Sequence, residues 1–303
     1  MPASLVTVGI PTYNRSDRLL RAVHSALAQD HEALEVVVSD DASTDSTEAG
    51  MRELAAREPR LRYVRQERNL GHAGNFQAVL DAARGDYFMW LSDDDWLDAA
   101  YVSSCLAVLV REPGTSLVAG LASYYSEGGH VIDERPMELA SARPGARVLR
   151  YLARVNMNGV LFGLARRADL QRLRFKEQVG GDWLLVSGLA AAGRVHTLSG
   201  VHIHRSISGL SSDRQKLAES LGMSGQLARH HHFAVAGAFA REIVSAPAYD
   251  GLSRPHRASL AVLAAALIVV RFPGGLAVRG LLRRLGLGGL EATAAAWVRR
   301  RDR

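Results

Sequence analysis

Three consecutive aspartates, Asp93, Asp94 and Asp95, follow the apolar segment 87–92. Adjacent carboxylates repel one another and raise each other's pKa, so such a cluster is unfavourable unless a positive charge lies among its members. Mg²⁺ and Mn²⁺ prefer carboxylate oxygens, and one or two carboxylates with substrate phosphates commonly hold them. The triplet therefore indicates a cation site. The alternative is a solvated acidic turn in which Asp95 or Asp98 caps the next helix.

Three other aspartates have surroundings suited to chemistry. Asp40 and Asp41 end a second apolar segment, where carboxylates can accept hydrogen bonds from a nucleobase imide or from ribose hydroxyls. Asp182 follows two glycines at the start of a third apolar segment, and a helix N-terminus there would stabilise its anion. Such a group acts as a general base if a substrate hydroxyl lies within hydrogen-bond reach. For each of these aspartates, a helix cap is the structural alternative.

His202 and His204 are two residues apart in a segment with strand character, so their side chains point to one face. The pair could bind a metal, although packed or surface histidines are commoner. The sequence has no phosphate-binding loop of the form G-x-x-x-x-G-K-[ST], no G-x-G-x-x-G after a strand, no G-x-S-x-G, no H-E-x-x-H and a single cysteine. The common NTPase, dehydrogenase, hydrolase and zinc-site interpretations lose most of their support.

The order of the apolar segments predicts how these residues are positioned. Buried strands are expected within 5–14, 34–43, 61–66 and 86–92, and helical patterns lie between them. This alternation predicts an α/β fold with a mostly parallel sheet flanked by helices. Ligands of such sheets bind beyond the carboxyl ends of the strands, so we expect the segments PTYN, SDDAS and SDDD to converge on one edge.

The second half of the chain predicts a different organisation. After a helix at 101–112 and a strand at 116–126, the segment 127–147 is expected to be a mobile connection. Residues 158–170 predict a strand, a turn and a short helix, residues 180–193 a loop that opens a helix, and 195–205 a late strand. From about Asp213 the pattern is helical. We therefore expect a catalytic domain over residues 1–212 and a helical C-terminal region over residues 213–303.

The net positive charge of the chain comes from its C-terminal segment. The formal net charge is +6, and the segment 271–303, with eight arginines against two acidic residues, carries all of it. This distribution favours a local anionic partner and argues against a nucleic-acid-binding body. The apolar run 260–270 falls short of the roughly 20 residues that cross a bilayer. The arginine and leucine pattern of 276–286 is typical of an amphipathic helix on an anionic membrane, with a packed helix as the alternative.

Cysteine usage and the N-terminus bear on the compartment. The single cysteine, Cys105, excludes an internal disulfide and fits a reducing environment. The first residues do not show the basic, apolar and small-residue regions of an export signal. We expect a cytoplasmic protein that associates peripherally with the inner face of the plasma membrane through its basic segment.

Taken together, GIPTYNRSDRLLRAVHSALAQ, VVVSDDASTDST, NLGHAGN, ARGDYFMWLSDDDWL and GGDW resemble the family 2 glycosyltransferases, which have the GT-A fold. These motifs cover residues 5 to about 205, in the order and at the spacing of the family. The form SDDDWL, with NLGHAGNF upstream, is most similar to bacterial O-antigen and surface-polysaccharide transferases, which use deoxysugar donors.

The resemblance implies an inverting, metal-dependent transfer of a sugar from a nucleotide-sugar donor to a hydroxyl of a glycan or lipid-linked acceptor. The donor would be a UDP-, dTDP-, GDP- or CDP-sugar, and the cofactor Mn²⁺ or Mg²⁺. By the same resemblance, Asp182 matches the catalytic base, and the metal ligands are Asp94, Asp95 and His204, with His202 the less favoured histidine. The positions that match nucleotide-sugar contacts are Pro11, Tyr13, Asp41, Asn69, Gly71 and Asp93.

Two positions depart from the family pattern. Ser92 stands where many members have an aspartate. The sequence therefore leaves open which two of the three carboxylates act. Gly180 and Gly181 precede Asp182, where a glutamate usually stands directly before the base.

Two other functions remain open. A sugar-nucleotide nucleotidyltransferase would have a glycine-rich basic loop after the first strand, which IPTYNR does not provide. A non-catalytic sugar-nucleotide-binding module would lack the base or the metal carboxylates, all of which are present.

Overall fold

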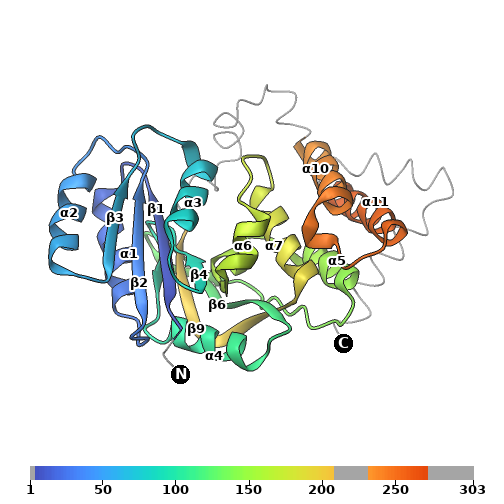
Figure 1. Cartoon of the computed structure of the whole chain (residues 1–303), viewed down its shortest axis with the longest axis horizontal. Helices are drawn as coiled ribbons and strands as arrows, with labels where there is room; N and C mark the ends of the chain where they lie inside the picture. The colour runs from blue at the N-terminus through green and yellow to red at the C-terminus, as the bar shows by residue number, and fades with distance from the viewer. Residues whose placement is uncertain (1–3, 208–230, 272–303) are drawn as a thin grey trace.

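Four parallel strands form the N-terminal half of a nine-stranded sheet (Figure 1). The computed structural model describes residues 4–207 and 231–271. The strands lie side by side in the order β3-β2-β1-β4, and all residues of β1 and β2 are buried, which accounts for their continuous apolar sequence. The strands and the helices between them are β1 (Val6–Thr12), α1 (Ser16–Leu27), β2 (Leu34–Asp40), α2 (Thr47–Arg57), β3 (Leu61–Arg65), α3 (Gly71–Ala82) and β4 (Tyr87–Trp90).

The second half of the sheet is mixed. Strand β8 pairs antiparallel with both β4 and β6, whereas β6 and β9 run parallel over most of their length. The predicted α/β fold with flanking helices is therefore confirmed, with antiparallel pairings in its second half. The elements are β5 (Trp96–Leu97), α4 (Tyr101–Arg111), β6 (Thr115–Ser126), β7 (Gly129–Asp133), β8 (Leu164–Arg166), α6 (Arg167–Leu173), α7 (Gly181–Ala192) and β9 (Arg194–Ser206).

Two segments differ from their predicted form. The expected connection at 127–147 contains β7 and the start of α5 (Pro144–Arg154). All five residues of β7 are exposed, so no alternation of buried and exposed positions marks the strand. The expected strand at the start of 158–170 is instead the 3₁₀-helix η1 (Gly159–Phe162), whose residues are all buried. Periodicity does not separate a short buried strand from a short buried helix.

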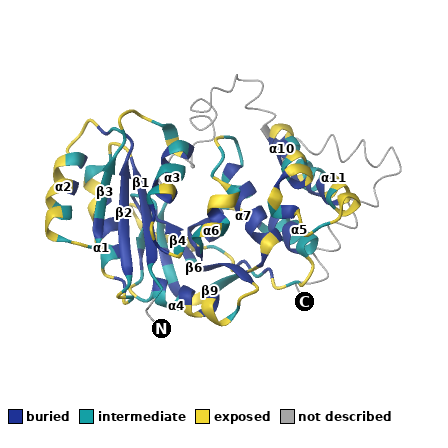
Figure 2. Ribbon diagram, in the orientation of Figure 1, coloured by how far each residue is buried: buried dark blue, intermediate teal, exposed yellow. Residues whose placement is uncertain are grey.

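The C-terminal described residues form a helical hairpin of α10 (His231–Ser245) and α11 (Arg254–Arg271), with the 3₁₀-helix η3 (Pro247–Tyr249) between them. In Figure 1 the two helices lie side by side, and the hairpin packs against α5 and α7. Its buried residues face these helices (Figure 2). The predicted helical character is confirmed for this part. The expected boundary at residue 213 and the basic segment beyond Arg271 lie outside the described residues.

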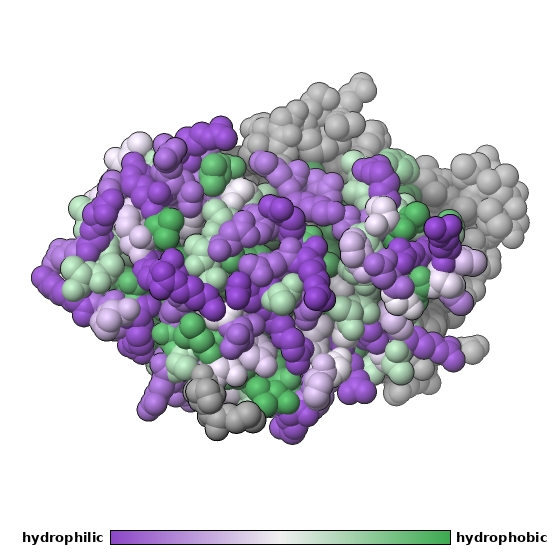
Figure 3. Space-filling model, in the orientation of Figure 1, coloured by the Kyte–Doolittle hydropathy of each residue, from purple (hydrophilic) through white to green (hydrophobic). Residues whose placement is uncertain are grey.

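The face of the molecule drawn in Figure 3 is mainly polar. Figure 3 shows a face on which hydrophilic side chains dominate, with smaller apolar patches between them. Among the helices that the structure describes, none combines the length and the apolar character needed to cross a bilayer.

Candidate active site at the carboxyl ends of the parallel strands

The carboxyl ends of β1, β2 and β4 meet at one edge of the sheet, as the sequence predicted. The Thr12 hydroxyl at the end of β1 donates to Asp93 Oδ2, after the end of β4, at 2.8 Å. Asn75 on α3 fastens the same edge, because its Nδ2 donates to the carbonyl oxygens of Thr12 at 3.2 Å and of Ser39 at 3.0 Å. Its own Oδ1 accepts from the Ser39 hydroxyl at 2.6 Å. Sequence reasoning missed Asn75, although it is the last residue of the motif NLGHAGN.

Asp41 holds the N-terminus of α3. Its carboxylate accepts from the backbone N–H of Leu70 at 2.6 Å and of Gly71 at 3.1 Å, and Gly71 adopts a φ of 76°. Asn69 Oδ1 accepts from the same Gly71 N–H at 2.9 Å. Burial raises the pKa of Asp41, and the two backbone hydrogen bonds oppose the rise. The predicted nucleotide contacts Asp41, Asn69 and Gly71 thus lie together at the N-terminus of α3. A helix N-terminus favours the binding of anions.

Asp40 has a structural role. One oxygen accepts from the Ser43 N–H at 2.9 Å, and the other accepts from the Tyr63 hydroxyl at 2.5 Å. Of the two predicted nucleotide contacts in β1 and the turn after it, Pro11 is buried in the strand and Tyr13 exposes 46% of its surface just beyond the strand end. Tyr13 is therefore accessible to a ligand at this edge.

The three aspartates of the triplet have three different environments. Burial raises the pKa of Asp93 to about 6, while the Thr12 hydrogen bond opposes the shift. Asp94 lies near the start of α1, where its Oδ2 is 3.6 Å from Arg15 Nη1 and 3.8 Å from Arg18 Nη1. Both distances exceed those of a tight charge-assisted hydrogen bond. In the described residues, arginines provide the positive charge that the triplet requires.

Asp95 forms a buried ion pair. Its Oδ2 accepts from Arg205 Nε at 2.9 Å, and its Oδ1 accepts from the Ser206 N–H at 3.0 Å. Burial by itself disfavours the charged guanidinium, but the Asp95 carboxylate raises the pKa of Arg205 above its ordinary value. The guanidinium also lies 4.0 Å from the centre of the Phe162 ring. Sequence reasoning did not single out Arg205.

Both ring nitrogens of His204 have hydrogen-bonding partners. Nε2 lies 2.8 Å from Asp98 Oδ1, and Nδ1 lies 3.1 Å from the Tyr125 hydroxyl. The ring stacks on Trp96 with 5.1 Å between centroids. His202 Nδ1 is 2.7 Å from the Ser123 hydroxyl.

The predicted metal ligands do not form one cluster. Within residues 4–207 and 231–271, no three His, Cys, Asp or Glu side chains are arranged to hold a metal ion. Asp94, Asp95 and His204 as ligands therefore stay a prediction. Asp94 fits a divalent cation best, because its carboxylate makes only long ionic contacts and one or two carboxylates with substrate phosphates are the usual ligands of Mg²⁺.

The predicted base lies in the first turn of α7. Asn158 Nδ2 donates to Asp182 Oδ2 at 2.8 Å, and Asn158 Oδ1 accepts from the Tyr151 hydroxyl at 2.9 Å. Asn158 has a φ of 58°, a conformation that asparagine tolerates better than most residues. Burial raises the pKa of Asp182, and the Asn158 hydrogen bond acts against this rise. A half-buried carboxylate with a raised pKa and one oriented oxygen has the properties of a general base.

The glycine before Asp182 has a steric explanation. A Cβ added to Gly181 would lie 2.1 Å from the carbonyl oxygen of Lys176. With the backbone of this loop, no residue larger than glycine fits, so the glutamate that usually precedes the base is excluded.

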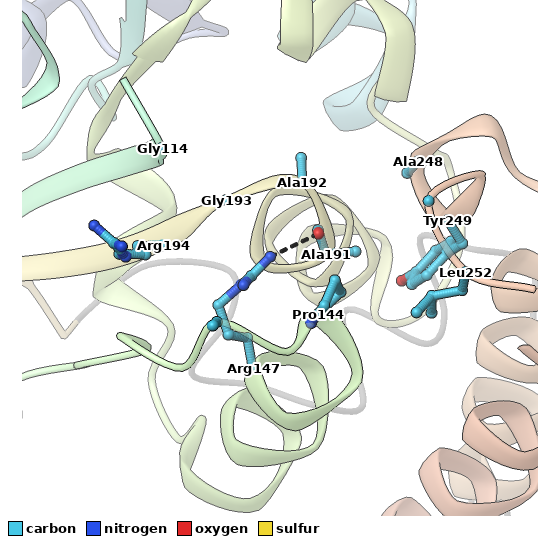
Figure 4. Close-up of a pocket in the computed structure, with 12 residues that line it drawn as sticks. Gly114, Pro144, Arg147, Ala191, Ala192, Gly193, Arg194, Ala248, Tyr249 and Leu252 are labelled. Atoms are coloured by element: carbon cyan, nitrogen blue, oxygen red, sulfur yellow. Dashed lines mark hydrogen bonds between the residues drawn. The ribbon is translucent and has the colours of Figure 1, made fainter. Parts of the chain in front are cut away.

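A separate cavity of about 530 Å³ lies at the opposite end of α7 (Figure 4). Arg147 fills one side of it and donates to the carbonyl oxygens of Ala190 at 2.6 Å and Ala191 at 2.9 Å. These contacts satisfy carbonyls of the last helical turn, which have no partner within the helix. The lining contains no carboxylate, so the cavity lacks the groups that define the site at the strand ends.

The architecture and the strand-end cluster define the class of protein. A sheet of this order, with acidic side chains and a helix N-terminus beyond its parallel strands, is the GT-A fold of the nucleotide-sugar transferases. The family model described as Glycosyl transferase family 2 matches residues 7–170. The chain belongs to this family.

Relatives with a described function are bacterial glycosyltransferases and polysaccharide synthases. The GalNAc(5)-diNAcBac-PP-undecaprenol beta-1,3-glucosyltransferase of Campylobacter jejuni is 28% identical over 185 residues, which is 58% of this chain and 56% of that protein. The chondroitin synthase of Escherichia coli is 41% identical over 103 residues, 34% of this chain and 15% of that protein. The matched part thus spans about half of the first protein and a small part of the second.

Solved structures share the fold. TarS of S. aureus, residues 1–349 in complex with UDP-GlcNAc, superposes with a TM-score of 0.62 at 18% identity, over 87% of this chain and 72% of that chain. The mannosyltransferase PcManGT from Pyrobaculum calidifontis, in complex with GDP-Man and Mn²⁺, superposes with a TM-score of 0.53 at 22% identity, over 97% of this chain and 86% of that chain.

Proposed function

We propose that this chain transfers a sugar, with inversion, from a nucleoside-diphosphate sugar to a hydroxyl of a glycan or lipid-linked acceptor, with the help of Mn²⁺ or Mg²⁺. One observation carries the proposal. Arg205 is bonded to Asp95 of the acidic triplet, and hydrogen bonds lead from Arg205 through Tyr124 and Glu134 to the backbone of Gly159, beside the Asn158 that holds Asp182. One hydrogen-bonded network therefore joins the triplet to the base, as a transfer between donor and acceptor requires.

The residues suit the steps of a single displacement. Asp182 takes the proton of the acceptor hydroxyl while that oxygen attacks the anomeric carbon from the face opposite the diphosphate. A carbon–oxygen bond to the acceptor forms, the bond to the phosphate oxygen breaks, and its electron pair leaves with the nucleoside diphosphate. Arg15 and Arg18 place positive charge beside Asp94, close to where the diphosphate would bind. A divalent cation held by Asp94 and the phosphates would neutralise the leaving group.

The comparisons support this choice of donor and acceptor. Neighbours of the same fold bind UDP-GlcNAc and GDP-Man, and relatives act in the assembly of glycans, one of them carried on undecaprenol. We therefore place the donor among the UDP-, dTDP-, GDP- and CDP-sugars. The acceptor is a growing glycan or a lipid-linked saccharide. The arginine-rich segment 271–303 is proposed to hold the protein at an anionic membrane on the cytoplasmic side.

Thermal unfolding with a panel of nucleoside diphosphates, with and without Mn²⁺, tests the donor and the metal. A ligand present at 100 times its Kd stabilises the native state by about 2.7 kcal/mol. We expect a rise in Tm with one nucleotide, and a larger rise when Mn²⁺ is added. The Asp94→Asn variant should lose the additional rise in Tm that Mn²⁺ causes. The control variant Asp169→Asn, in the first turn of α6, should retain this rise.

If no nucleotide raises the Tm of the wild-type chain under either condition, donor binding at this edge is excluded. If Asp94→Asn keeps the full effect of Mn²⁺, Asp94 is not the metal ligand.

The Asn158→Gly variant tests how the base is positioned. Glycine adopts the φ of 58° without strain but removes the amide that lowers the pKa of Asp182. The base must be ionised, so the transfer rate falls as the pH drops through its pKa. In the variant this fall should occur at higher pH, and kcat measured across pH 5 to 9 records the shift. Arg174→Gly, at another residue with positive φ, is the control. If the fall in kcat at low pH occurs at the same pH in the variant and the wild type, Asn158 does not lower the pKa of the base.

A further inference from the structure

Helix α11 has apolar residues around most of its circumference. Four residues, Leu260, Ala261, Ala264 and Ile268, are buried and form its inner face, and the helix packs against α5 and α10. The outer face is also apolar. Val262 exposes 65% of its surface and Leu263 exposes 40%.

The outward residues form a continuous stripe. Ala258, Ser259, Val262 and Leu263 are exposed, and Ala266 and Val270 are half-buried at helical spacing along the same side. No charged residue occurs from 258 to 270. A surface helix of a globular protein normally carries charged residues on its outer face. An exposed apolar stripe rimmed by polar residues marks an interaction surface.

The charges around the stripe favour an anionic partner. Arg254 and Arg257 lie in the first turn of α11 and Arg271 at its end, and the helix contains no acidic residue. The chain beyond Arg271 adds seven arginines against two acidic residues. A second copy of the chain would bring a like-charged helix against this one. An anionic bilayer suits both the apolar stripe and the positive charge, because Arg254 at the start of the helix can reach the lipid headgroups. Arg257 is instead paired with Asp250, and Arg271 is bonded to the carbonyl oxygens of α5.

The C-terminal end of α11 lies near the proposed base. The Arg271 guanidinium at the end of α11 lies 5.8 Å from the centre of the Trp183 ring, and Trp183 follows Asp182. The same guanidinium donates to the carbonyl oxygens of Leu152 and Val155 at the end of α5. The C-terminal end of α11 is thus fixed beside the helix that carries the base.

We propose that the outward face of α11 lies in the interfacial region of an anionic bilayer and holds the enzyme so that a lipid-linked acceptor reaches Asp182. This inference rests on the proposed function and adds a described surface to it, namely the stripe of outward-facing residues within 258–270. The hydrocarbon part of the acceptor stays in the bilayer, and its saccharide meets the base at the end of the helix.

The test compares two double variants of the full chain. Val262→Ser/Leu263→Ser removes the centre of the stripe. Val131→Ser/Ile132→Ser on β7 is the matched control, because these residues expose 52% and 54% of their surface elsewhere. Binding is measured by co-sedimentation with vesicles of phosphatidylglycerol and phosphatidylcholine. We expect the wild type and the control to bind alike and the α11 variant to bind at least about tenfold more weakly, with an unchanged Tm.

Equal binding by both double variants would overturn the proposal, and so would a wild-type chain that does not bind anionic vesicles. A dimer detected by light scattering that only the α11 variant loses would assign the stripe to a second copy and would also overturn it. The nucleotide-dependent rise in Tm is measured on the same proteins without vesicles. Its absence would count against the proposed transfer, whereas a wild-type chain that shows this rise but does not bind the vesicles would count against the stripe alone.

Discussion

Replacing Asp182 by asparagine should lower the rate of sugar transfer by about 10³-fold and leave the affinity for the nucleoside diphosphate unchanged. Asparagine has nearly the same shape, and its amide oxygen can still accept the hydrogen bond that Asn158 Nδ2 donates at 2.8 Å. The substitution therefore preserves the geometry of the first turn of α7 and removes only the capacity to take a proton. Release of nucleoside diphosphate in the presence of acceptor measures the rate, and calorimetric titration measures the affinity.

The control is Asp169→Asn, which also changes a carboxylate in the first turn of a helix. Its transfer rate should stay within about twofold of the wild type, because no proposed catalytic step uses Asp169. Unchanged turnover in Asp182→Asn would remove Asp182 from its role. A fall in nucleotide affinity as large as the fall in rate would assign Asp182 to donor binding instead.

The edge of the sheet could be predicted because it depends on local sequence. Apolar runs rich in β-branched residues identify β1 and β2, and an aromatic apolar run identifies β4. The order of strands and helices makes these strands parallel, which brings Thr12 and Asp93 within hydrogen-bond distance. Asn75 could have been found from its position in the motif NLGHAGN, and its amide donates to the carbonyls of both Thr12 and Ser39.

Features that depend on distant contacts could not be predicted. Arg205 is 110 residues from Asp95 in the sequence, and no local pattern distinguishes it from a solvated arginine at a strand end. The role of Asn158 could not be predicted for the same reason. The Asn-Gly dipeptide indicates a turn, but only the folded chain shows that its amide reaches Asp182 and that Tyr151 fixes its other end.

The largest expected loss of stability comes from Arg205→Met. The substitution keeps much of the packing volume against Phe162 but leaves Asp95, which is 1% exposed, without its partner. Breaking a buried ion pair by removing one charge typically costs about 3 to 5 kcal/mol, because the remaining charge is uncompensated. Urea denaturation of the variant should show a loss of this size in the free energy of unfolding.

The double variant Asp95→Asn/Arg205→Met should recover much of that loss, because neither charge then remains and the asparagine can still accept from the Ser206 N–H. Arg52→Met is the control, since it breaks an exposed pair with Glu48 that should contribute at most about 0.5 kcal/mol. Mn²⁺ separates the two proposed roles of Asp95. If Mn²⁺ without nucleotide restores the stability of Arg205→Met and leaves the double variant unaffected, the cation replaces the guanidinium and Asp95 is a metal ligand. If it restores neither, the ion pair with Arg205 is the role of Asp95, and Asp94 is left to hold the metal with the phosphates of the donor.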